Sequence, residues 1–377
     1  MTPQLPYGRQ SIDDDDVAAV AAALRSDWLT TGPAVDTFEA ALARVAGGHP
    51  TVAVNSGTAA LHCAYAAAGL GPGTELVTTP LTFVATAGMA VHLGATVRFA
   101  DIEDDTLTLD PASVAAVVSE STRVVTGVAY AGHPADWDGL AAVVPAHVVT
   151  VDDAAHAIGG RYRGRPVGDL ADLTVFSFHP VKTVTTAEGG AVVTRRADLA
   201  EAVRRFRNHG LVREREQLRE PHEGGWHQEV HRLGFNYRMP DVLAALGASQ
   251  LRKLDAFVAR RARLVARYGE LLGDVAGLRL PAQRPDVDPA WHLYAVRVLD
   301  GRRHEVFDRM RAAAIGVQVH YLPVHRHPAF ADLGYRNGMC PVAEAAYEQL
   351  LSLPLYPDLT DDQQDRVVAA MRAALGG

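Results

Sequence analysis

Residues 174–194, TVFSFHPVKTVTTAEGGAVVT, join two apolar, strand-like ends through a polar centre. The ends, 174–178 and 191–194, are short apolar runs of the kind that form buried strands. The centre holds one lysine, Lys182, which must reach water, pair with an anion or lose its charge. A neutral lysine is a nucleophile that can form a Schiff base. This stretch alone leaves open whether Lys182 reaches solvent at a loop mouth or takes part in chemistry.

The sequence upstream of this stretch predicts an α/β fold. From about residue 50, short apolar runs alternate with helix-like segments, as in βα units. The strand-like runs are TVAV (51–54), ELVTTP (75–80), TVRFA (96–100), RVVTGVAYA (123–131) and HVVTVDD (147–153). Because these runs are largely apolar rather than alternating, we expect a mostly parallel sheet that is buried on both faces.

After LGFNYRMPD (233–241) the pattern changes. Residues 242–272 predict one or two long helices. Short strands are expected at 292–299 and 317–322, and helices at 302–314 and 363–375. We therefore divide the chain into a large domain with an N-terminal segment, residues 1–240, and a small C-terminal α/β domain, residues 241–377. The charged, glycine-containing stretch 213–225 is the most disorder-prone.

Composition excludes several classes of function. The 377 residues carry a net charge of −8, so no broad basic surface is expected for nucleic acid. Two cysteines, Cys63 and Cys340, are too few for a disulfide framework or a cysteine-based zinc site. The first sixteen residues do not resemble a signal peptide, and no apolar run reaches the roughly 18 residues of a spanning helix. We expect a cytoplasmic protein without a membrane span.

The stretch NSGTAALH (55–62) follows a predicted strand and opens a predicted helix. Gly57 allows a ligand to approach the main chain, Thr58 offers a hydroxyl, and a helix N-terminus favours phosphate. The alternative is that Ser56 or Thr58 only caps the helix. Neither a Walker loop nor a dinucleotide-binding glycine motif is present.

Other polar and aromatic residues follow neighbouring strands. Asp152 and Asp153 end a buried parallel strand, where a carboxylate can hold a cationic ring nitrogen or cap a helix. Ser177 can donate to a phosphate, and Phe83 can stack on a planar ring or pack in the core. Together with Lys182 and the phosphate cradle, these residues form the set that pyridoxal phosphate requires.

Two histidine pairs need separate explanations. His227 and His231 in WHQEVH are four residues apart, but Gln228 stands where zinc proteases carry glutamate, so we predict no metal site. His325 and His327 in PVHRHPAF belong to a substrate-facing loop or to plain surface.

At these motifs the sequence resembles the DegT/StrS-type sugar aminotransferases, pyridoxal-phosphate enzymes of fold type I. The matching segments run through almost the whole chain, and the most specific are FSFHPVKTVTTAEGG (176–190) and GFNYRM (234–239). The resemblance implies an aspartate-aminotransferase-like large domain with a seven-stranded, mostly parallel sheet. Within the family, the pattern is most similar to the pseudaminic acid pathway enzymes that aminate C4 of a UDP-linked 4-keto-6-deoxy-N-acetylhexosamine.

The resemblance also implies roles for individual residues. Lys182 is the Schiff-base lysine, and a lysine rather than a histidine there marks transamination rather than dehydration. Asp153 faces the pyridine nitrogen, His156 lies near the phenolic oxygen and Phe83 stacks on the ring. The phosphate is held by Gly57, Thr58, Ala59 and Ser177, and by Asn236 of a neighbouring subunit, which makes the working unit a homodimer with shared active sites. The substrate candidates are Tyr7, Arg9, Arg238, His320, Tyr321 and His325.

We therefore expect transfer of an amino group, with glutamate as the donor, to a nucleotide-linked keto sugar by a ping-pong Schiff-base mechanism. Two alternatives stay open. One is the same chemistry on another carbonyl acceptor, such as a cyclitol or a secondary-metabolite intermediate. The other is a regulatory protein that binds pyridoxal phosphate without turnover, against which the intact set of lysine, aspartate and phosphate residues argues. Ala129 and His133 depart from the family pattern and are candidates to line the acceptor site.

Overall fold

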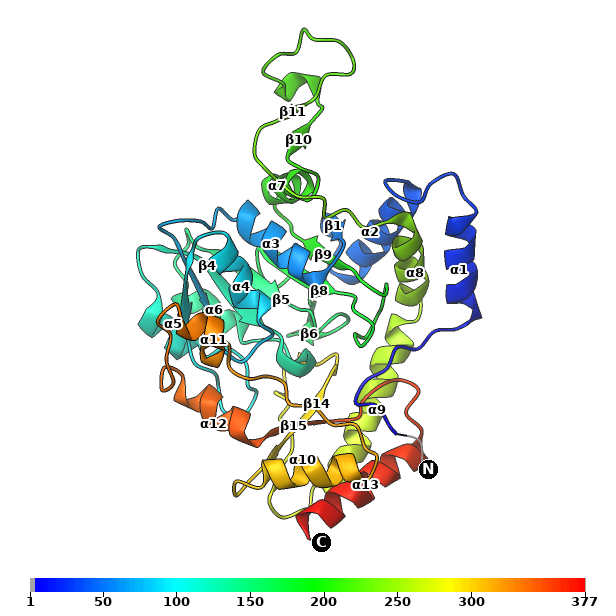
Figure 1. Ribbon diagram of the computed structural model, residues 1–377, viewed down its shortest axis with the longest axis vertical. Coiled ribbons are helices and arrows are strands. Elements are labelled where there is room, and N and C mark those ends of the chain that lie inside the picture. Colours follow the sequence, from blue (N-terminus) through cyan, green and yellow to red (C-terminus); the bar gives the residue numbers. More distant parts are fainter. Residues whose placement is uncertain (1–3, 377) are drawn as a thin grey trace.

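A seven-stranded sheet forms the centre of the computed structural model, which describes residues 4–376 (Figure 1). In sheet order the strands are β1 (Thr51–Val54), β9 (Gly190–Val193), β8 (Leu173–Ser177), β5 (Val149–Asp153), β4 (Thr122–Val128), β2 (Glu75–Thr78) and β3 (Thr96–Phe99). Only β9 runs antiparallel to its neighbours, β1 and β8. The predicted mostly parallel sheet of seven strands is confirmed.

Helices cover both faces of this sheet (Figure 1). One face packs against α3 (Gly57–Ala67), α4 (Ala85–His92) and α7 (Ala197–Arg207). The other packs against α2 (Pro33–Val45), α5 (Pro111–Val117), α6 (Trp137–Val143) and α8 (Asp241–Leu251). In β1, Val52 and Val54 join the first apolar cluster and Ala53 joins the second, as the alternation of a strand requires. Apolar residues on both faces explain why the strand sequences lack a polar side.

Local sequence explains where several helices begin. A capping box opens α1 (Asp14–Leu24), where the carboxylates of Asp13 and Asp16 each accept the other's main-chain N–H. Thr360 and Gln363 make the same reciprocal arrangement at α13 (Asp361–Leu375). Each of these helices therefore starts with its free N–H groups partly satisfied.

The C-terminal third builds a second, antiparallel sheet of β12 (Leu278–Arg279), β14 (Tyr294–Val298) and β15 (Leu350–Leu353). Its helices are α9 (Leu254–Leu272), α10 (Arg303–Ala312), α11 (Pro328–Ala331), α12 (Pro341–Gln349) and α13. The predicted helices over 242–272, 302–314 and 363–375 therefore exist. The domain boundary after residue 240 stays a prediction, and α8, which follows it, packs against α1 and α2.

The strand expected over 317–322 is wrong. In this segment only Gln318 pairs with another strand, through a single bridge to Ser352, and the following residues turn towards the large sheet. The strand that sequence reasoning missed is β15, an apolar run of four residues directly after α12. Its short length makes it indistinguishable from the end of a buried helix.

The N-terminal segment is attached to this second sheet. Leu5 forms a bridge with Ile315, and the carbonyl of Tyr7 accepts the N–H of Leu355 at 3.0 Å. The chain then runs to α1, where Gln250 and Lys253 bind the buried carboxylate of Asp16. A segment that starts the sequence thus lies beside residues that nearly end it.

Two small antiparallel sheets complete the fold. One has three strands, in the order β13 (Val287–Asp288), β6 (Arg161–Tyr162) and β7 (Arg165–Pro166), and the other pairs β10 (Leu211–Val212) with β11 (Glu229–Val230). Single turns of helix are η1 (Tyr130–Gly132), η2 (Arg215–Gln217) and η3 (Val324–Arg326). In residues 4–376, no helix is long and apolar enough to cross a membrane.

The hairpin of β10 and β11 projects beyond α7 at the top of the molecule (Figure 1). The Glu229 carboxylate organises it: it accepts the N–H groups of Arg219 and Glu220 and contacts the imidazoles of His227 and His231. These hydrogen bonds lower the pKa of Glu229 to about 2. His227 and His231 flank a strand rather than lying on a helix. Their four-residue spacing lets both imidazoles contact the carboxylate of Glu229.

Candidate active site

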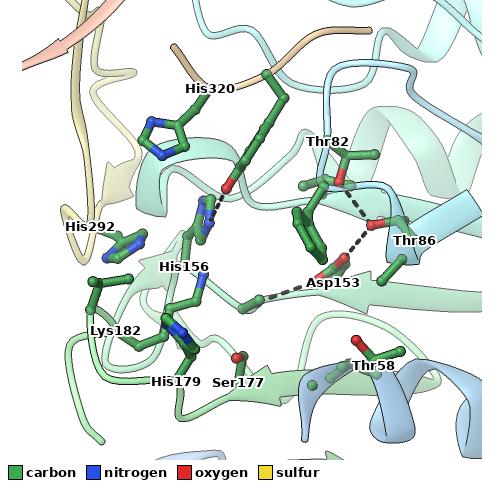
Figure 2. Close-up of a pocket in the computed structure, with 18 of the residues that line it drawn as sticks. Thr58, Thr82, Thr86, Asp153, His156, Ser177, His179, Lys182, His292 and His320 are labelled. Atoms are coloured by element: carbon green, nitrogen blue, oxygen red, sulfur yellow. Dashed lines mark hydrogen bonds between the residues drawn. The ribbon is translucent and has the colours of Figure 1, made fainter. Parts of the chain in front are cut away.

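A cavity of about 560 Å³ lies at the carboxyl ends of β4, β5 and β8, beside the N-terminus of α3 (Figure 2). Its walls include Thr58 on α3, Thr86 on α4, Asp153 and His156 at and after β5, and Ser177 and Lys182 at and after β8. The segment 318–321 and Tyr7 close the side next to the second sheet. Parallel strands bring their ends to one edge, so residues far apart in sequence meet here.

Lys182 lies in the turn after β8, where its N–H donates to the carbonyl of His179 at 2.9 Å. Its side chain lines the cavity and is half-buried, with the amine deep among protein atoms. No carboxylate in residues 4–376 lies within 4 Å of this amine. Burial lowers the pKa of Lys182 to about 8, and the charge of Asp153 acts in the opposite direction. The structure therefore favours the chemical interpretation of Lys182 over a lysine that simply reaches water.

We expect Lys182 to react with amine reagents at unusually low pH. With a pKa near 8, about half of the amine is neutral at pH 8, whereas an ordinary lysine is less than about 1% neutral. The measurement is the rate of modification against pH, followed by peptide mass spectrometry on protein freed of small molecules. Lys253, the chain's other lysine, is the control. Burial lowers its pKa, but hydrogen bonds to Asp13 and Asp16 outweigh this and raise it. Parallel curves that both rise only above pH 10 would contradict the assignment.

Asp153 ends β5 and is buried against the cavity. Its Oδ2 accepts the hydroxyl of Thr86 at 2.7 Å, and its Oδ1 accepts the N–H of Ala155 at 3.3 Å. Burial raises the pKa of Asp153, and these two hydrogen bonds and the charge of Lys182 oppose that rise. No helix starts here, so Asp153 is not a helix cap. A carboxylate oriented in this way is suited to face a cation.

The neighbouring Asp152 points away from the cavity because successive side chains of a strand alternate. It is fully buried, and neither of its oxygens has a hydrogen-bond partner among the described residues. Burial and the charge of Asp153 raise its pKa well above the usual range, which favours the neutral acid. Of the two aspartates, only Asp153 is placed for chemistry in this cavity.

Besides His179, the imidazoles of His156, His292 and His320 lie on the Lys182 side of the cavity (Figure 2). His156 and His292 lie with their ring centroids 4.5 Å apart, and His156 Nε2 is 3.2 Å from the hydroxyl of Tyr321. Burial lowers the pKa of all three, to about 4 for His320, and a charged Lys182 lowers each further. Sequence reasoning missed His292, because HLY in WHLYAVRV is indistinguishable from the start of an apolar strand.

The start of α3 offers an anion site beside Ser177. Ser56 caps the helix by accepting the N–H of Ala59 at 3.1 Å, which leaves the N–H groups of Gly57 and Thr58 outside the helical bonding pattern. A Cβ on Gly57 would lie 2.8 Å from Cβ of Ser177, so only glycine keeps this space open. Ala59 does not line the cavity and its N–H donates to Ser56, so its contact with phosphate stays a prediction. Capping and phosphate binding are thus compatible functions of one turn.

Phe83 lies in the loop before α4 and lines the cavity with 56% of its surface exposed, so it is not a core residue. Its ring centroid is 6.1 Å from that of Tyr321. Tyr7 and His320 also line the cavity, with ring centroids 5.3 Å apart. These aromatic rings give the cavity side chains that can stack on a planar ligand.

The structure separates several predicted substrate residues from the cavity. His325 is fully buried and bonded to Glu344 at 2.8 Å, so the expectation that it faces substrate is wrong. Arg9 is exposed outside the cavity. Arg238 donates to Asn208, which forms a bridge with Asn236, and neither Arg238 nor Asn236 lines the cavity of its own chain.

Ala129 and His133, the two residues that depart from the family pattern, are buried. Both ring nitrogens of His133 are bonded to main-chain groups, so these two residues do not line the site.

Comparisons with known proteins agree with this geometry. The model of the DegT/DnrJ/EryC1/StrS aminotransferase family matches residues 10–372. The spore coat polysaccharide biosynthesis protein SpsC of Bacillus subtilis is 38% identical, over 99% of this chain and 97% of its own. The putative sugar aminotransferase Spr1654 of Streptococcus pneumoniae, solved in its PLP form, superposes with a TM-score of 0.92 and 29% identity, over 99% of this chain and 98% of its own.

The PseC aminotransferase of Helicobacter pylori, involved in pseudaminic acid biosynthesis, also superposes with a TM-score of 0.92, at 28% identity over 99% of both chains. The sequence and structural matches therefore agree from end to end. This chain belongs to the DegT/DnrJ/EryC1/StrS aminotransferase family, whose members depend on pyridoxal phosphate.

Proposed function

We propose that this pyridoxal-phosphate-dependent aminotransferase moves an amino group from glutamate to the keto group of a nucleotide-linked 4-keto-6-deoxy sugar. The observation that carries the chemistry is the pair formed by Lys182, with its lowered pKa, and the buried strand-end carboxylate of Asp153 in one cavity. The sugar is supported by the relatives, since SpsC is named for polysaccharide biosynthesis and PseC for pseudaminic acid biosynthesis.

The residues of the cavity fit pyridoxal phosphate. The space kept open by Gly57, with the hydroxyls of Thr58 and Ser177 beside it, suits a phosphate at a helix N-terminus. The carboxylate of Asp153 suits a protonated ring nitrogen, and the exposed ring of Phe83 suits a stacked aromatic. When bound, the cofactor supplies a ring that takes up the electrons released when a proton leaves the substrate carbon.

The protein's own groups then have defined tasks. The amine of Lys182 would attach the cofactor covalently. Once free, Nζ of Lys182 would accept the proton from the substrate carbon as general base and return it as general acid. Asp153 would hold the proton on the ring nitrogen, and Thr86 orients the Asp153 carboxylate. His156, held by Tyr321, offers a neutral imidazole beside the amine.

The cavity has few cations for anionic substrates. Among residues 4–376, no arginine lines it, and burial lowers the pKa of three of its four imidazoles, those of His156, His292 and His320. A nucleotide diphosphate and a glutamate carboxylate both need cations or N–H donors. A second depression of about 560 Å³ near Asn236 carries Arg204, Arg205, Arg207, Arg213 and Arg238, together with Asp36, Glu201 and Glu214. This separation supports a homodimer in which a second copy brings Asn236 and positive charge to the site.

Mixed dimers test this arrangement. Lys182→Ala and Asn236→Ala protomers are each expected to be impaired, and co-refolding them in equal amounts should restore about one quarter of wild-type activity. The reason is that half of the dimers are mixed, and each mixed dimer has one intact site out of two. If Asn236 acts only within its own chain, the mixture will show no more activity than the two variants measured separately.

The substrate is tested by half-reactions. The holoenzyme is treated with glutamate, its absorbance is followed, and the product form is offered a panel of UDP- and dTDP-linked keto sugars and cyclitol ketones. Return of the original spectrum with a nucleotide sugar supports the proposal. Return only with a cyclitol supports the other acceptor class, and a spectrum that ignores every amino donor supports a protein that binds the cofactor without turnover.

A further inference from the structure

Arg261 is a fully buried arginine without an anionic partner. It lies on α9 with 1% of its surface exposed, and no carboxylate in residues 4–376 lies within 4 Å of its guanidinium. Its Nη1 donates to the carbonyls of Leu355 at 2.9 Å and His292 at 3.3 Å, while Nε and Nη2 have no hydrogen-bond partner among the described residues. Burial lowers the pKa of Arg261 to about 10, so it is still charged near neutral pH.

An unpaired buried charge is costly, and other buried arginines of this chain avoid that cost. Arg297 pairs with Asp104 at 2.5 Å. Arg303 lies 3.7 Å from the carboxylate of Glu348 and over the ring of Tyr347. Arg261 is therefore an exception to the rule that a buried charge is paired. Exceptions of this kind are expected at functional sites.

The main chain that Arg261 holds carries His292 into the cavity. The carbonyl of His292 accepts a hydrogen bond from the guanidinium, and the N–H of His292 donates to the carbonyl of Ala131 at 2.8 Å, so the main chain is held on both sides of the His292 Cα. The His292 ring then packs at 4.5 Å against His156, next to Lys182 (Figure 2). Neither ring nitrogen of His292 forms a hydrogen bond within the described residues. Its placement therefore depends on main-chain bonds and ring packing.

We propose that Arg261 is a positioning residue of the active site that acts through His292: it fixes the main chain that sets the His292 ring against His156, and it places an unpaired positive charge close to His292. In the interior, that charge opposes protonation of His292. The neutral His292 ring then holds His156 in place beside the amine of Lys182. The inference rests on the proposed active site, but its first test does not need the cofactor.

The first test is histidine ring NMR of the cofactor-free protein. Ring nitrogens are followed against pH in wild type, Arg261→Met and the matched control Arg303→Met, with His292 and His156 assigned through His292→Gln and His156→Gln. In Arg261→Met the signals of both rings should shift, and His292 should titrate about one pH unit higher than in wild type. Lys182, Asp153, His320 and Tyr321, which also face these rings, are unchanged in both arginine variants.

Arg303→Met should leave the signals of His292 and His156 in place. If the two rings in Arg261→Met keep wild-type shifts and titration over the whole pH range in which the protein is folded, the proposal is overturned. It is equally overturned if Arg303→Met moves them as much. Should Arg261→Met not fold, His292→Phe and His292→Gln replace it. In His292→Phe, the phenyl ring should leave the His156 signals near their wild-type positions. In His292→Gln, the amide should displace these signals. Equal effects of the two variants on His156 would refute the positioning role.

The second test is kinetic and uses the holoenzyme. Arg261→Met should lower kcat for the glutamate half-reaction about tenfold, with KM changed less than about twofold, because substrate contacts are untouched. Arg261→Lys keeps the charge and should recover part of the lost kcat. A Lys variant no better than the Met variant contradicts the role of the charge. If wild-type protein shows no half-reaction at all, the proposed function is wrong. The NMR experiment still tests the role of Arg261 independently of that outcome.

Discussion

Lys182→Ala should abolish turnover, with a loss in kcat of about 10⁴-fold or more in both half-reactions. Two functions disappear together: the amine that attaches the cofactor, and the base that carries the proton on and off the substrate carbon. The fold should survive, because Lys182 lies in a turn and forms no ion pair among the described residues. The measurement is single-turnover absorbance with glutamate, together with thermal unfolding to confirm that the variant is folded.

The lysine content makes this prediction unusually easy to control. The chain has two lysines, Lys182 and Lys253. Treating the holoenzyme with borohydride should fix the cofactor to the peptide containing Lys182, and mass spectrometry should find no label on Lys253. Lys253→Ala, which removes an ion pair with Asp13 and Asp16 far from the cavity, should keep the label and the activity. Label on Lys253, or full activity in Lys182→Ala, would remove the basis of the proposed mechanism.

Asp153→Asn should lower kcat by about 10²- to 10³-fold, the range typical of losing one preorganised electrostatic contact in an active site. The amide has the shape of the carboxylate and keeps an oxygen for the Thr86 hydroxyl, but it carries no negative charge to hold a proton on a ring nitrogen. Substrate affinity should change little, because the lost interaction is strongest in the transition state. The check is kcat and KM for the glutamate half-reaction, measured with saturating cofactor.

Asp152→Asn is the matched control, since it makes the same chemical change one residue earlier on β5. Asp152 faces away from the cavity, and its raised pKa already favours the uncharged acid, so the amide should leave kcat near the wild-type value. A large loss in Asp152→Asn, or a small one in Asp153→Asn, would mean that the two side chains have exchanged the functions assigned here.

The α/β architecture could be predicted from sequence because its signal is local. The runs at 51–54, 75–78 and 149–153 are each buried strands, and helices α3, α4, α5 and α6 connect the successive strands from β1 to β5. Prediction failed where the apolar run was short. Residues 350–353 form a strand that was not predicted, and residues 317–322 do not form the strand that was predicted. Both lie where tertiary contacts, rather than periodicity, decide the backbone.

Some residues of the candidate site could likewise be predicted from the sequence, and others could not. Lys182, Asp153, Ser177 and Gly57 could be predicted because each follows or ends a strand that delivers it to one edge. His292 and Thr86 could not, because their importance depends on what packs beside them across the fold. His325 shows the opposite error, since a loop histidine in a polar stretch can still be buried against a carboxylate such as Glu344.

The attachment of the N-terminal segment to the second sheet has a consequence for how such an enzyme can diverge. Lys182, Asp153 and Gly57 stand on the ends of the large sheet, whereas Tyr7 and His320 reach the cavity from backbone bound to the second one. The two walls therefore have largely different supports, which meet where Tyr321 contacts His156. Substitutions at Tyr7, Gln318 or Val319 can reshape the pocket for a new acceptor while this contact, the amine, the carboxylate and the phosphate-binding turn stay in place. Selection for a different sugar would then act on one wall while the chemistry is inherited unchanged on the other.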